Sequence, residues 1–320
     1  MTDTYYLGVE IGGTKQQICL GYADGTILES TDVRLGQVKA PAILDWIRDT
    51  VRRYQARFPI AGIGVGFGGP LELRTGRILC SLQVEGWKDF HLNDWFRDTF
   101  GLPCVVANDT FTGGVAELHR GSGIGENTLF YTNIGTGIGG GLFINGRGYD
   151  GSGFGAAYLG NTLVPDWRAE APGAMTRMEL ICSGRSIAER LSQPGYVPTT
   201  SALHALGKRL SDEHTERSAR ELGQAVSLGD TFACEELDRI ARTFSVSLVN
   251  MLALSGVSAV VIGGGVAKMG PALFDRIERF TDELAFSANK GRYHIRPSRL
   301  MDEAVPTGAL ILAAGGQEFL

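Results

Sequence analysis

A short apolar segment, Val105–Ala107, is followed directly by Asn108 and Asp109. The apolar residues predict a buried strand that stops at Asn108, and a helical pattern begins behind it. Open α/β sheets bind their ligands at the carboxyl ends of such strands. A carboxylate placed there can accept the proton of a hydroxyl group that attacks a phosphoryl group. Asp109 is therefore a candidate general base, with the alternative that it only caps the following helix, as Asp and Asn often do.

Two glycine-rich turns follow apolar strands elsewhere in the chain, at Gly12–Lys15 and at Gly135–Gly137. Each turn contains a threonine, and the first also contains a lysine. Backbone N–H groups, a hydroxyl and an ammonium group in such a turn can bind phosphate oxygens. Either turn taken alone is also compatible with a plain hairpin connection.

The two turns occupy the same place in an internal repeat. Each copy reads as a strand, a Gly-Thr turn, a second strand, a further turn and a third strand, with Asp24-Gly25 and Asn145-Gly146 in the further turns. The repeat predicts two related lobes, each with one phosphate-binding turn. Two such turns that face each other across a cleft could hold a polyphosphate from both sides.

A third glycine cluster, Gly263–Gly265, follows the apolar segment Ala259–Ile262. A triple glycine between a strand and a helix allows a flat ring or a ribose to lie against the backbone. The alternative interpretation is a tight turn between strand and helix.

The remaining pattern alternates strands with helices. Apolar periodicity predicts helices over residues 42–58, 92–100, 231–254, 271–286 and 305–314, and strands over residues 62–67, 259–262 and 293–297. This alternation is typical of an α/β fold. We place the boundary between the two lobes near residue 118, which gives lobes of residues 1–118 and 119–303.

Composition limits the classes of partner. The chain has 320 residues, 43% of them hydrophobic and 20% charged, which is enough for two globular domains. A net charge of -5 argues against nucleic acid as a partner. The five scattered cysteines fit a reducing compartment and predict neither disulfides nor a zinc cluster. The N-terminus does not read as a signal peptide, and no apolar run reaches the ~20 residues of a membrane span, so we expect a cytoplasmic protein with no membrane partner.

Several motifs occur in the order expected of one protein family. They are GVEIGGTK at residues 8–15, GGP at 68–70, ND at 108–109, IGTGIGGG at 134–141, ME at 178–179 and VIGGGV at 261–266. With these motifs the chain resembles the ROK family of sugar kinases over about Leu7 to Ala314. The resemblance implies a two-lobed actin-like ATPase (ribonuclease H-like) fold. It also implies that a C-terminal helix, about residues 304–320, packs back on the first lobe.

The resemblance implies a role for each matching residue. Asp109 would take the proton of the attacking sugar hydroxyl, and Glu10, where many relatives carry Asp, would lie near Mg²⁺. The sugar would be held by Gly69, Asn108 and Glu179. The residues that bind ATP would come from the two glycine turns and the triple glycine: Gly12, Gly13, Thr14, Lys15, Gly135, Thr136, Gly137, Gly264 and Gly265.

The chain departs from the family pattern at one side of the sugar pocket. Many relatives carry Glu-x-Gly-His after the second phosphate loop, where this chain has Tyr158 and Asn161 at the Glu and His positions. We therefore expect Tyr158 and Asn161 to line a rebuilt pocket. That histidine is also a zinc ligand in those relatives, together with three cysteines, and residues 173–179 contain no cysteine here. Because a zinc site needs about four N or S ligands, we predict no structural zinc.

The resemblance predicts a glucokinase-like enzyme that uses ATP and Mg²⁺ to phosphorylate a hydroxyl of a hexose or hexose-like sugar. One alternative is a kinase for an amino sugar or a cyclitol, because the pocket is rebuilt. Another is a ROK protein that senses a sugar without catalysis. Repressors of the family carry a DNA-binding segment ahead of the first phosphate loop, and only a short stretch precedes the loop here. We expect a homodimer, as relatives often form, and leave open whether ATP or polyphosphate is the better donor.

Overall fold

The computed structural model describes residues 4–13, 15–34, 36, 38–81, 84–211 and 214–315. The described chain forms two compact units. The first unit contains the residues up to Tyr131, the segment Gly141–Ala157 and the residues from Ser298 onward. The second unit contains Thr132–Gly140 and Tyr158–Pro297.

The first unit is built on a five-stranded sheet with the order β3-β2-β1-β4-β8. Strands β1, β2 and β3 pair antiparallel, whereas β4 pairs parallel with β1 and β8 pairs parallel with β4. The parallel strands therefore bring the ends of β1, β4 and β8 to one edge of the sheet. The strand bounds are Tyr5–Ile11 for β1, Gln16–Gly21 for β2, Ile27–Val33 for β3, Ile60–Phe67 for β4 and Cys104–Asn108 for β8.

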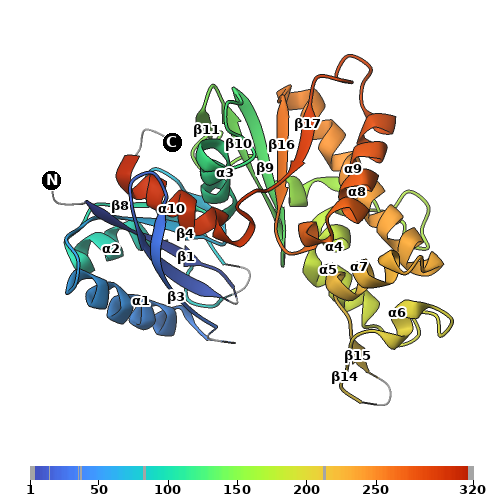
Figure 1. The fold of residues 1–320 in the computed structure, drawn as a ribbon, viewed down its shortest axis with the longest axis horizontal. Helices are drawn as coiled ribbons and strands as arrows, with labels where there is room; N and C mark the ends of the chain where they lie inside the picture. Colours follow the sequence, from blue (N-terminus) through green and yellow to red (C-terminus); the bar gives the residue numbers. More distant parts are fainter. Residues whose placement is uncertain are drawn as a thin grey trace. The chain divides into compact units, whose positions relative to one another are not determined.

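Glycines on one face of this sheet allow a helix to approach the strands closely. Gly8 of β1 pairs with Gly64 of β4, so the two glycines point to the same face. A Cβ atom at Gly64 would lie 1.9 Å from the carbonyl oxygen of Ala309. Ala309 belongs to α10 (Ala304–Gly315), which lies across β1 and β4 (Figure 1). The C-terminal helix therefore packs its backbone directly onto the sheet.

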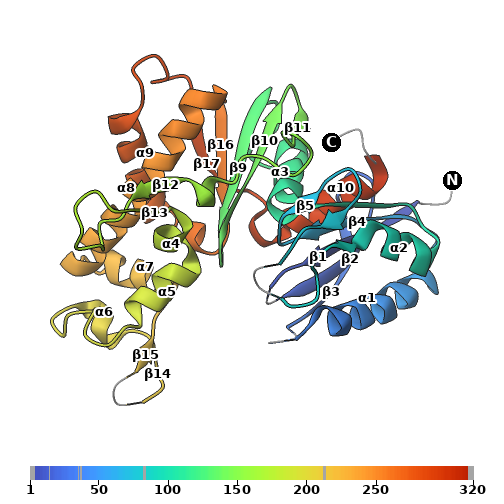
Figure 2. The ribbon, with the colours of Figure 1, turned by 180° about the vertical axis from the view of Figure 1, so that it is seen from behind.

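Helix α1 (Ala40–Gln55) covers the opposite face, as the two ribbon views show (Figures 1 and 2). It buries Ile43, Ile47 and Val51 at the predicted helical spacing. The helix begins two residues before the predicted start because Pro41 fits its first turn. It ends at Gln55, where the N–H groups of the next residues turn back to the last carbonyls.

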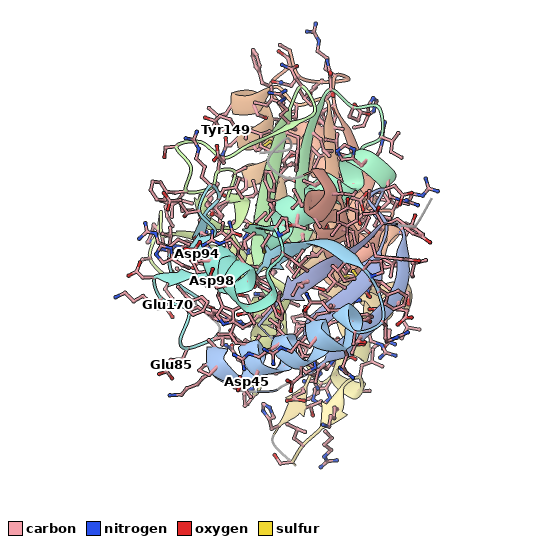
Figure 3. The ribbon with its side chains drawn as sticks, turned by 90° about the vertical axis from the view of Figure 1, so that its left-hand side faces the viewer. Asp45, Glu85, Asp94, Asp98, Tyr149 and Glu170 are labelled. Carbon is pink, nitrogen blue, oxygen red and sulfur yellow. The ribbon has the colours of Figure 1, made fainter. Side chains whose placement is uncertain are left out.

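Shorter elements complete the first unit. Helix α2 (Leu92–Phe100) has the predicted bounds and ends at Gly101, whose φ of 67° suits a glycine cap. Figure 3 shows Asp94 and Asp98 on this helix, and Asp45 on α1, at the surface. The other elements are β5 (Leu71–Glu72), β6 (Arg77–Ile78), β7 (Phe90–His91), α3 (Asp109–Arg120) and the short helix η3 (Met301–Glu303).

A second sheet has the order β11-β10-β9-β16-β17, which repeats the arrangement of the first sheet. Its first three strands correspond to the second copy of the predicted repeat, and the predicted third strand is the short β11. The bounds are Thr128–Ile134 for β9, Ile138–Ile144 for β10, Arg147–Tyr149 for β11, Ala259–Gly263 for β16 and His294–Pro297 for β17.

The helices of the second unit are dominated by α8 (Thr231–Ser255), which packs against α9 (Pro271–Leu284). The side chain of Asp230 caps the start of α8, and Gly256 ends it with φ of 65°. Several short elements also occur here. The remaining bounds are η1 (Leu159–Asn161), β12 (Leu163–Pro165), β13 (Met175–Arg177), α4 (Glu179–Cys182), α5 (Gly184–Leu191), α6 (Ala202–Ala205), β14 (Lys208–Arg209), β15 (Thr215–Glu216), α7 (Ala219–Ser227) and η2 (Val266–Met269).

Within the described residues, none of the helices combines the length and the apolar character that a bilayer crossing requires.

Candidate active site

The sequence left open whether Asp109 acts as a base or only caps the following helix. In the structure the cap is provided by Asn108. Asn108 is the N-cap of α3, because its Oδ1 accepts hydrogen bonds from the backbone N–H groups of Thr110 and Phe111, at 3.0 and 3.3 Å. Its Nδ2 donates to the carbonyl oxygen of Gly69 at 3.1 Å. The Asn108 amide thus joins the end of β8 to the loop after β4, and the cap does not depend on Asp109.

Asp109 is the first residue of α3, beside the loop that follows β4. Its Oδ1 accepts the N–H of Thr110 at 2.7 Å. Its Oδ2 lies 3.3 Å from the place that a Cβ atom at Gly68 would take, and the same position is 3.7 Å from the Cα atom of Gly12. The glycine loop after β1, the glycine pair after β4 and the Asp109 carboxyl group therefore meet at one edge of the sheet.

The environment of Asp109 changes its acidity. Burial raises the pKa of the carboxyl group from 3.8 to about 6, against the hydrogen bonds from Thr110, which lower the pKa. A carboxylate with a pKa near the working pH can both accept and release a proton. This electrostatic state suits a general base.

The first glycine loop is closed by short-range hydrogen bonds. The N–H of Gly12 donates to the carbonyl oxygen of Lys15 at 3.1 Å. The side chain of Gln16, which is 2% exposed, donates from Nε2 to the carbonyl oxygen of Gly12 at 2.8 Å. Gly13 lies in the same loop, whereas Thr14 lies outside the described residues. The loop is therefore shaped partly by Gln16, a residue that the motif alone did not single out.

Glu10 points to the same region from β1. Its Oε2 is buried and has no hydrogen-bond partner among the described residues, and the Nζ of Lys15 is 4.0 Å away. Burial raises the pKa of the Glu10 carboxyl group to about 7; Lys15 opposes this, and the charges of Asp109 and Asp302 add to it. A buried carboxylate oxygen without a partner, near two more carboxylates, fits a divalent cation.

Mg²⁺ in kinases is held by one or two carboxylates together with substrate phosphates. In the part of the chain that the structure describes, no group of three or more His, Cys, Asp or Glu side chains forms a complete metal cage. Glu10 therefore fits a divalent cation only if a bound molecule supplies further ligands.

The second glycine loop joins β9 to β10. The N–H of Gly135 donates to the carbonyl oxygen of Gly137 at 3.0 Å, and the carbonyl oxygen of Gly135 accepts the N–H of Gly184 at 2.7 Å. Thr136, between the two glycines, is exposed. Gly184 is the first residue of α5, so the second glycine loop is hydrogen-bonded to the start of that helix.

The predicted sugar residues of the second unit lie beside this second loop. The Oε2 of Glu179 accepts the N–H of Ile138 at 3.4 Å. A Cβ atom at Gly160 would lie 2.3 Å from the carbonyl oxygen of Ile138 and 3.1 Å from the Cβ of Glu179. Gly160 stands between Tyr158 and Asn161, whose backbones are joined by a hydrogen bond of 3.0 Å. The turn with Tyr158 and Asn161 therefore lies next to Glu179 and the second loop.

The triple glycine has two different environments. A Cβ atom at Gly264 would lie 2.7 Å from the backbone of Ile134, and Gly264 has φ of +88°. Gly265 has open space on the side where a Cβ atom would project. Gly264 is thus required by close packing at the end of β9, and the open position at Gly265 leaves room for a ligand.

A profile of the ROK family matches residues 6–315 of the chain. The chain belongs to the ROK family.

Individual ROK proteins resemble this chain over nearly its whole length. The glucokinase of Halalkalibacterium halodurans is 28% identical over 293 residues, which cover 89% of this chain and 87% of that protein. The kanosamine kinase of Amycolatopsis mediterranei is 26% identical, covering 98% of this chain and 97% of that protein. The crystal structure of a ROK family glucokinase from Streptomyces griseus, in complex with glucose and AMPPNP, has a TM-score of 0.83 at 26% identity and covers 98% of this chain and 100% of that chain. The predicted ROK fold, of the actin-like ATPase class, is confirmed.

Two residues of this ROK protein that sequence reasoning missed lie near the predicted site. Asp302 acts on the Glu10 carboxyl group through its charge, although it lies at the far end of the chain. Gln16 holds the first glycine loop from inside the sheet. Two adjacent acidic residues, Asp302 and Glu303, precede the C-terminal helix, and this pair could have marked Asp302 as a candidate. Nothing in the local sequence distinguishes Gln16 from its neighbour Gln17.

Proposed function

We propose that this ROK protein is an ATP-dependent sugar kinase, which transfers the γ-phosphoryl group of ATP to a hydroxyl group of a hexose. The observation that carries the proposal is the Asp109 carboxyl group, whose pKa is raised to about 6 beside the first glycine loop. The similarity to glucokinases over most of the chain supports the same activity.

In the proposed reaction the sugar oxygen forms a bond to the γ-phosphorus as the bond to the β-γ bridging oxygen breaks. The proton of the sugar hydroxyl passes to Asp109, and ADP leaves with the bridging oxygen. Phosphoryl transfer depends mainly on positioning and on neutralisation of charge. We propose that Lys15 and the backbone N–H groups of both glycine loops bind the phosphates, and that Gly265 lies against the adenosine.

We propose Glu10 as the residue that would hold Mg²⁺. The chemistry that Mg²⁺ supplies when bound is neutralisation of charge on the phosphate oxygens. The buried Glu10 Oε2 that lacks a hydrogen-bond partner among the described residues supports this role. We keep the prediction that no structural zinc is required, since residues 173–179 carry no cysteine.

The acceptor is proposed to be a glucose-like hexose, held by Gly69, Asn108, Glu179, Tyr158 and Asn161. Asn108 would act partly through Gly69, because its Nδ2 already bonds that carbonyl. The similarity to a kanosamine kinase favours an amino sugar as the second candidate acceptor. We further propose a cytoplasmic homodimer; the cysteines of the described chain are all unpaired, as in a reducing compartment.

The decisive experiment is a coupled assay of ADP release with Mg·ATP and a panel of glucose, mannose, fructose, glucosamine, kanosamine and inositol. We expect turnover with at least one hexose, and turnover lower by about 10²–10⁴-fold in the Asp109→Asn variant. Turnover only with the aminated sugars would move the acceptor to the amino-sugar class. Binding of a sugar by calorimetry, without ADP release for any member of the panel, would replace the kinase with a sugar-sensing protein.

A further inference from the structure

The second unit carries an arginine-lined hollow outside the candidate active site. The hollow has a volume of about 540 Å³, and none of its lining residues is acidic. A second hollow of about 430 Å³ adjoins it and shares Arg168 and Tyr196 with it. The lining residues of the first hollow are Trp167, Arg168, Tyr196, Arg239, Arg242 and Thr243.

Helix α8 and the segment between β12 and β13 hold these side chains together. Arg239 and Arg242 are one helical turn apart on α8, so they share a face of the helix. The indole Nε1 of Trp167 donates to the Thr243 hydroxyl at 3.2 Å. The guanidinium carbon of Arg239 is 5.5 Å from the centre of the Trp167 ring. The indole therefore helps to fix the position of Arg239, whereas the guanidinium carbon of Arg242 is 5.4 Å from the centre of the Phe280 ring.

The carboxylates that pair with the two α8 arginines hold them weakly. Arg242 is 3.1 Å from Glu283, and both side chains are 51% exposed. Arg239 is 3.6 Å from Glu235 on the same helix, and both are also largely exposed. Exposed pairs of this kind contribute little, because water and salt screen them. A ligand with several anionic oxygens can therefore compete for both guanidinium groups.

Arg168 is oriented by bonds that leave part of its guanidinium group free to donate. Its Nε and Nη2 donate to the two carboxylate oxygens of Asp166, and its Nη1 donates to the carbonyl oxygen of Leu180 at 2.6 Å. A guanidinium group has five N–H donors, and these bonds use three of them. Arg168 is thus a pre-positioned donor on the wall shared by the two hollows.

A buried arginine behind the same wall is incompletely hydrogen-bonded. Arg190 is 4% exposed, its Nε donates to Glu236 at 2.6 Å, and its Nη1 donates to backbone carbonyls. Its Nη2 is buried and makes no hydrogen bond of good geometry among the described residues; the Tyr196 hydroxyl, which donates to Glu236, is at most a weak hydrogen-bond partner of the guanidinium group. Arg190 lines the adjoining hollow, and its guanidinium carbon is 5.4 Å from the Trp167 ring centre. A buried charged donor that is weakly hydrogen-bonded is unfavourable, and an incoming oxyanion would supply a better acceptor.

We propose that this hollow is a second ligand site, for a small metabolite that carries at least two anionic groups. Phosphoryl or carboxylate groups would bind Arg168, Arg239 and Arg242, because guanidinium groups pair with both in a bidentate manner. None of the lining residues belongs to the proposed site of phosphoryl transfer, so the inference goes beyond the proposed function.

Calorimetric titration of the full chain with pyrophosphate and with citrate, as separate probes, tests the site. Each titration is done with AMPPNP and Mg²⁺ present, so that the phosphate loops are occupied. We expect one or both probes to bind, and the Arg239→Gln/Arg242→Gln variant to bind at least about tenfold more weakly, since two charged hydrogen-bond donors are lost. Arg279→Gln is the matched control, because Arg279 is an exposed arginine of α9 that pairs with Asp238 and does not line the hollow.

The identity of the probe that binds distinguishes a phosphate ligand from a carboxylate ligand. Binding in this hollow should change the tryptophan fluorescence of the wild type, because Trp167 lines it. The Trp167→Phe variant should lose that change. Absence of binding by either probe, or equal loss of affinity in the Arg279→Gln variant, would overturn the proposal. A change in molecular mass of the double variant by light scattering would also overturn it, since the arginines would then belong to an interface between copies. This experiment measures binding and not turnover. Its outcome can therefore be interpreted even if the protein proves not to be a kinase.

Discussion

Both polar atoms of the Asn108 side chain form hydrogen bonds with the backbone. It caps α3 through Oδ1 and holds the loop at Gly69 through Nδ2. Asp109 is therefore relieved of the capping role and can face the reactants. The adjacent pair combines one residue that fixes the backbone with one residue whose protonation state can change.

We predict that Asp109→Asn lowers kcat by about 10²–10⁴-fold, the range typical of general-base catalysis, and leaves the fold intact. The amide has nearly the shape of the carboxyl group but cannot accept the proton. Steady-state assays with the best acceptor measure kcat, and circular dichroism checks the fold. Asp94→Asn, at an exposed position of α2, is the matched control and should keep normal turnover. Turnover of Asp109→Asn close to that of the control would remove Asp109 from the role of base.

The pKa of Asp109 also predicts the dependence of rate on pH. A general base must be ionised in the free enzyme, so kcat/KM should fall as the pH drops through about 6. The fall should approach tenfold per pH unit below that value. A rate profile between pH 4.5 and 8.5, at fixed ionic strength, provides the measurement. A flat profile down to pH 5 would contradict the raised pKa or the assigned role.

The same raised pKa predicts an effect on stability. A carboxyl group with a pKa of about 6 in the folded protein and 3.8 as its ordinary value binds more protons when folded, so its ionisation opposes folding as the pH rises between the two values. Asp109→Asn should therefore be more stable than the wild type above pH 6, by up to about 3 kcal/mol, and equally stable near pH 4. Urea unfolding at the two pH values measures the difference. A stability gain that is the same at both would show that charge is not its cause.

At the scale of elements, the alternate glycines of β4 have a packing function. They are on the face that receives α10, and the helix backbone takes the place of side chains. We predict that Gly64→Ala destabilises the protein by at least about 2 kcal/mol, because its Cβ would overlap a backbone carbonyl that cannot move alone. Ala61→Ser, at an exposed position of the same strand, is the control. Thermal unfolding of the two variants gives the comparison, and equal midpoints would mean that α10 can shift away from the sheet.

Sequence patterns predicted the elements that carry strong periodicity or clear caps. Helix α8 was predicted within one residue of its observed bounds because its apolar stripe is long and Gly256 ends it. The short α6 and the β14-β15 hairpin were missed, since a few residues contain too little periodicity to be distinguished from turns. The alternate glycines of β4 could be seen in the sequence. The reason for them, contact with α10, could not, because that helix follows more than two hundred residues later. The predicted site residues all belong to contiguous sequence motifs. Asp302 belongs to none of these motifs and is brought near Glu10 only by the fold.

At the scale of the whole molecule, the two glycine loops belong to different units. In the proposed function both loops bind the phosphates of the nucleotide. Amide hydrogen exchange of the full chain should slow at Gly12 and Gly13 in the first unit, and at Gly135–Gly137 in the second, when Mg·AMPPNP is added. A nucleotide that contacts one loop alone would protect one segment alone.

Sugar without nucleotide is the control for this last experiment. It should slow exchange around Tyr158–Asn161 and Asp109 and leave the backbone of the first glycine loop unchanged, because that loop is proposed to contact only phosphate. In the Glu10→Gln variant, protection by Mg·AMPPNP should require more Mg²⁺, since the carboxylate proposed to hold the cation is lost. Protection of only one loop at saturating nucleotide would separate the two loops in function, and the second loop would then need a role other than phosphate binding.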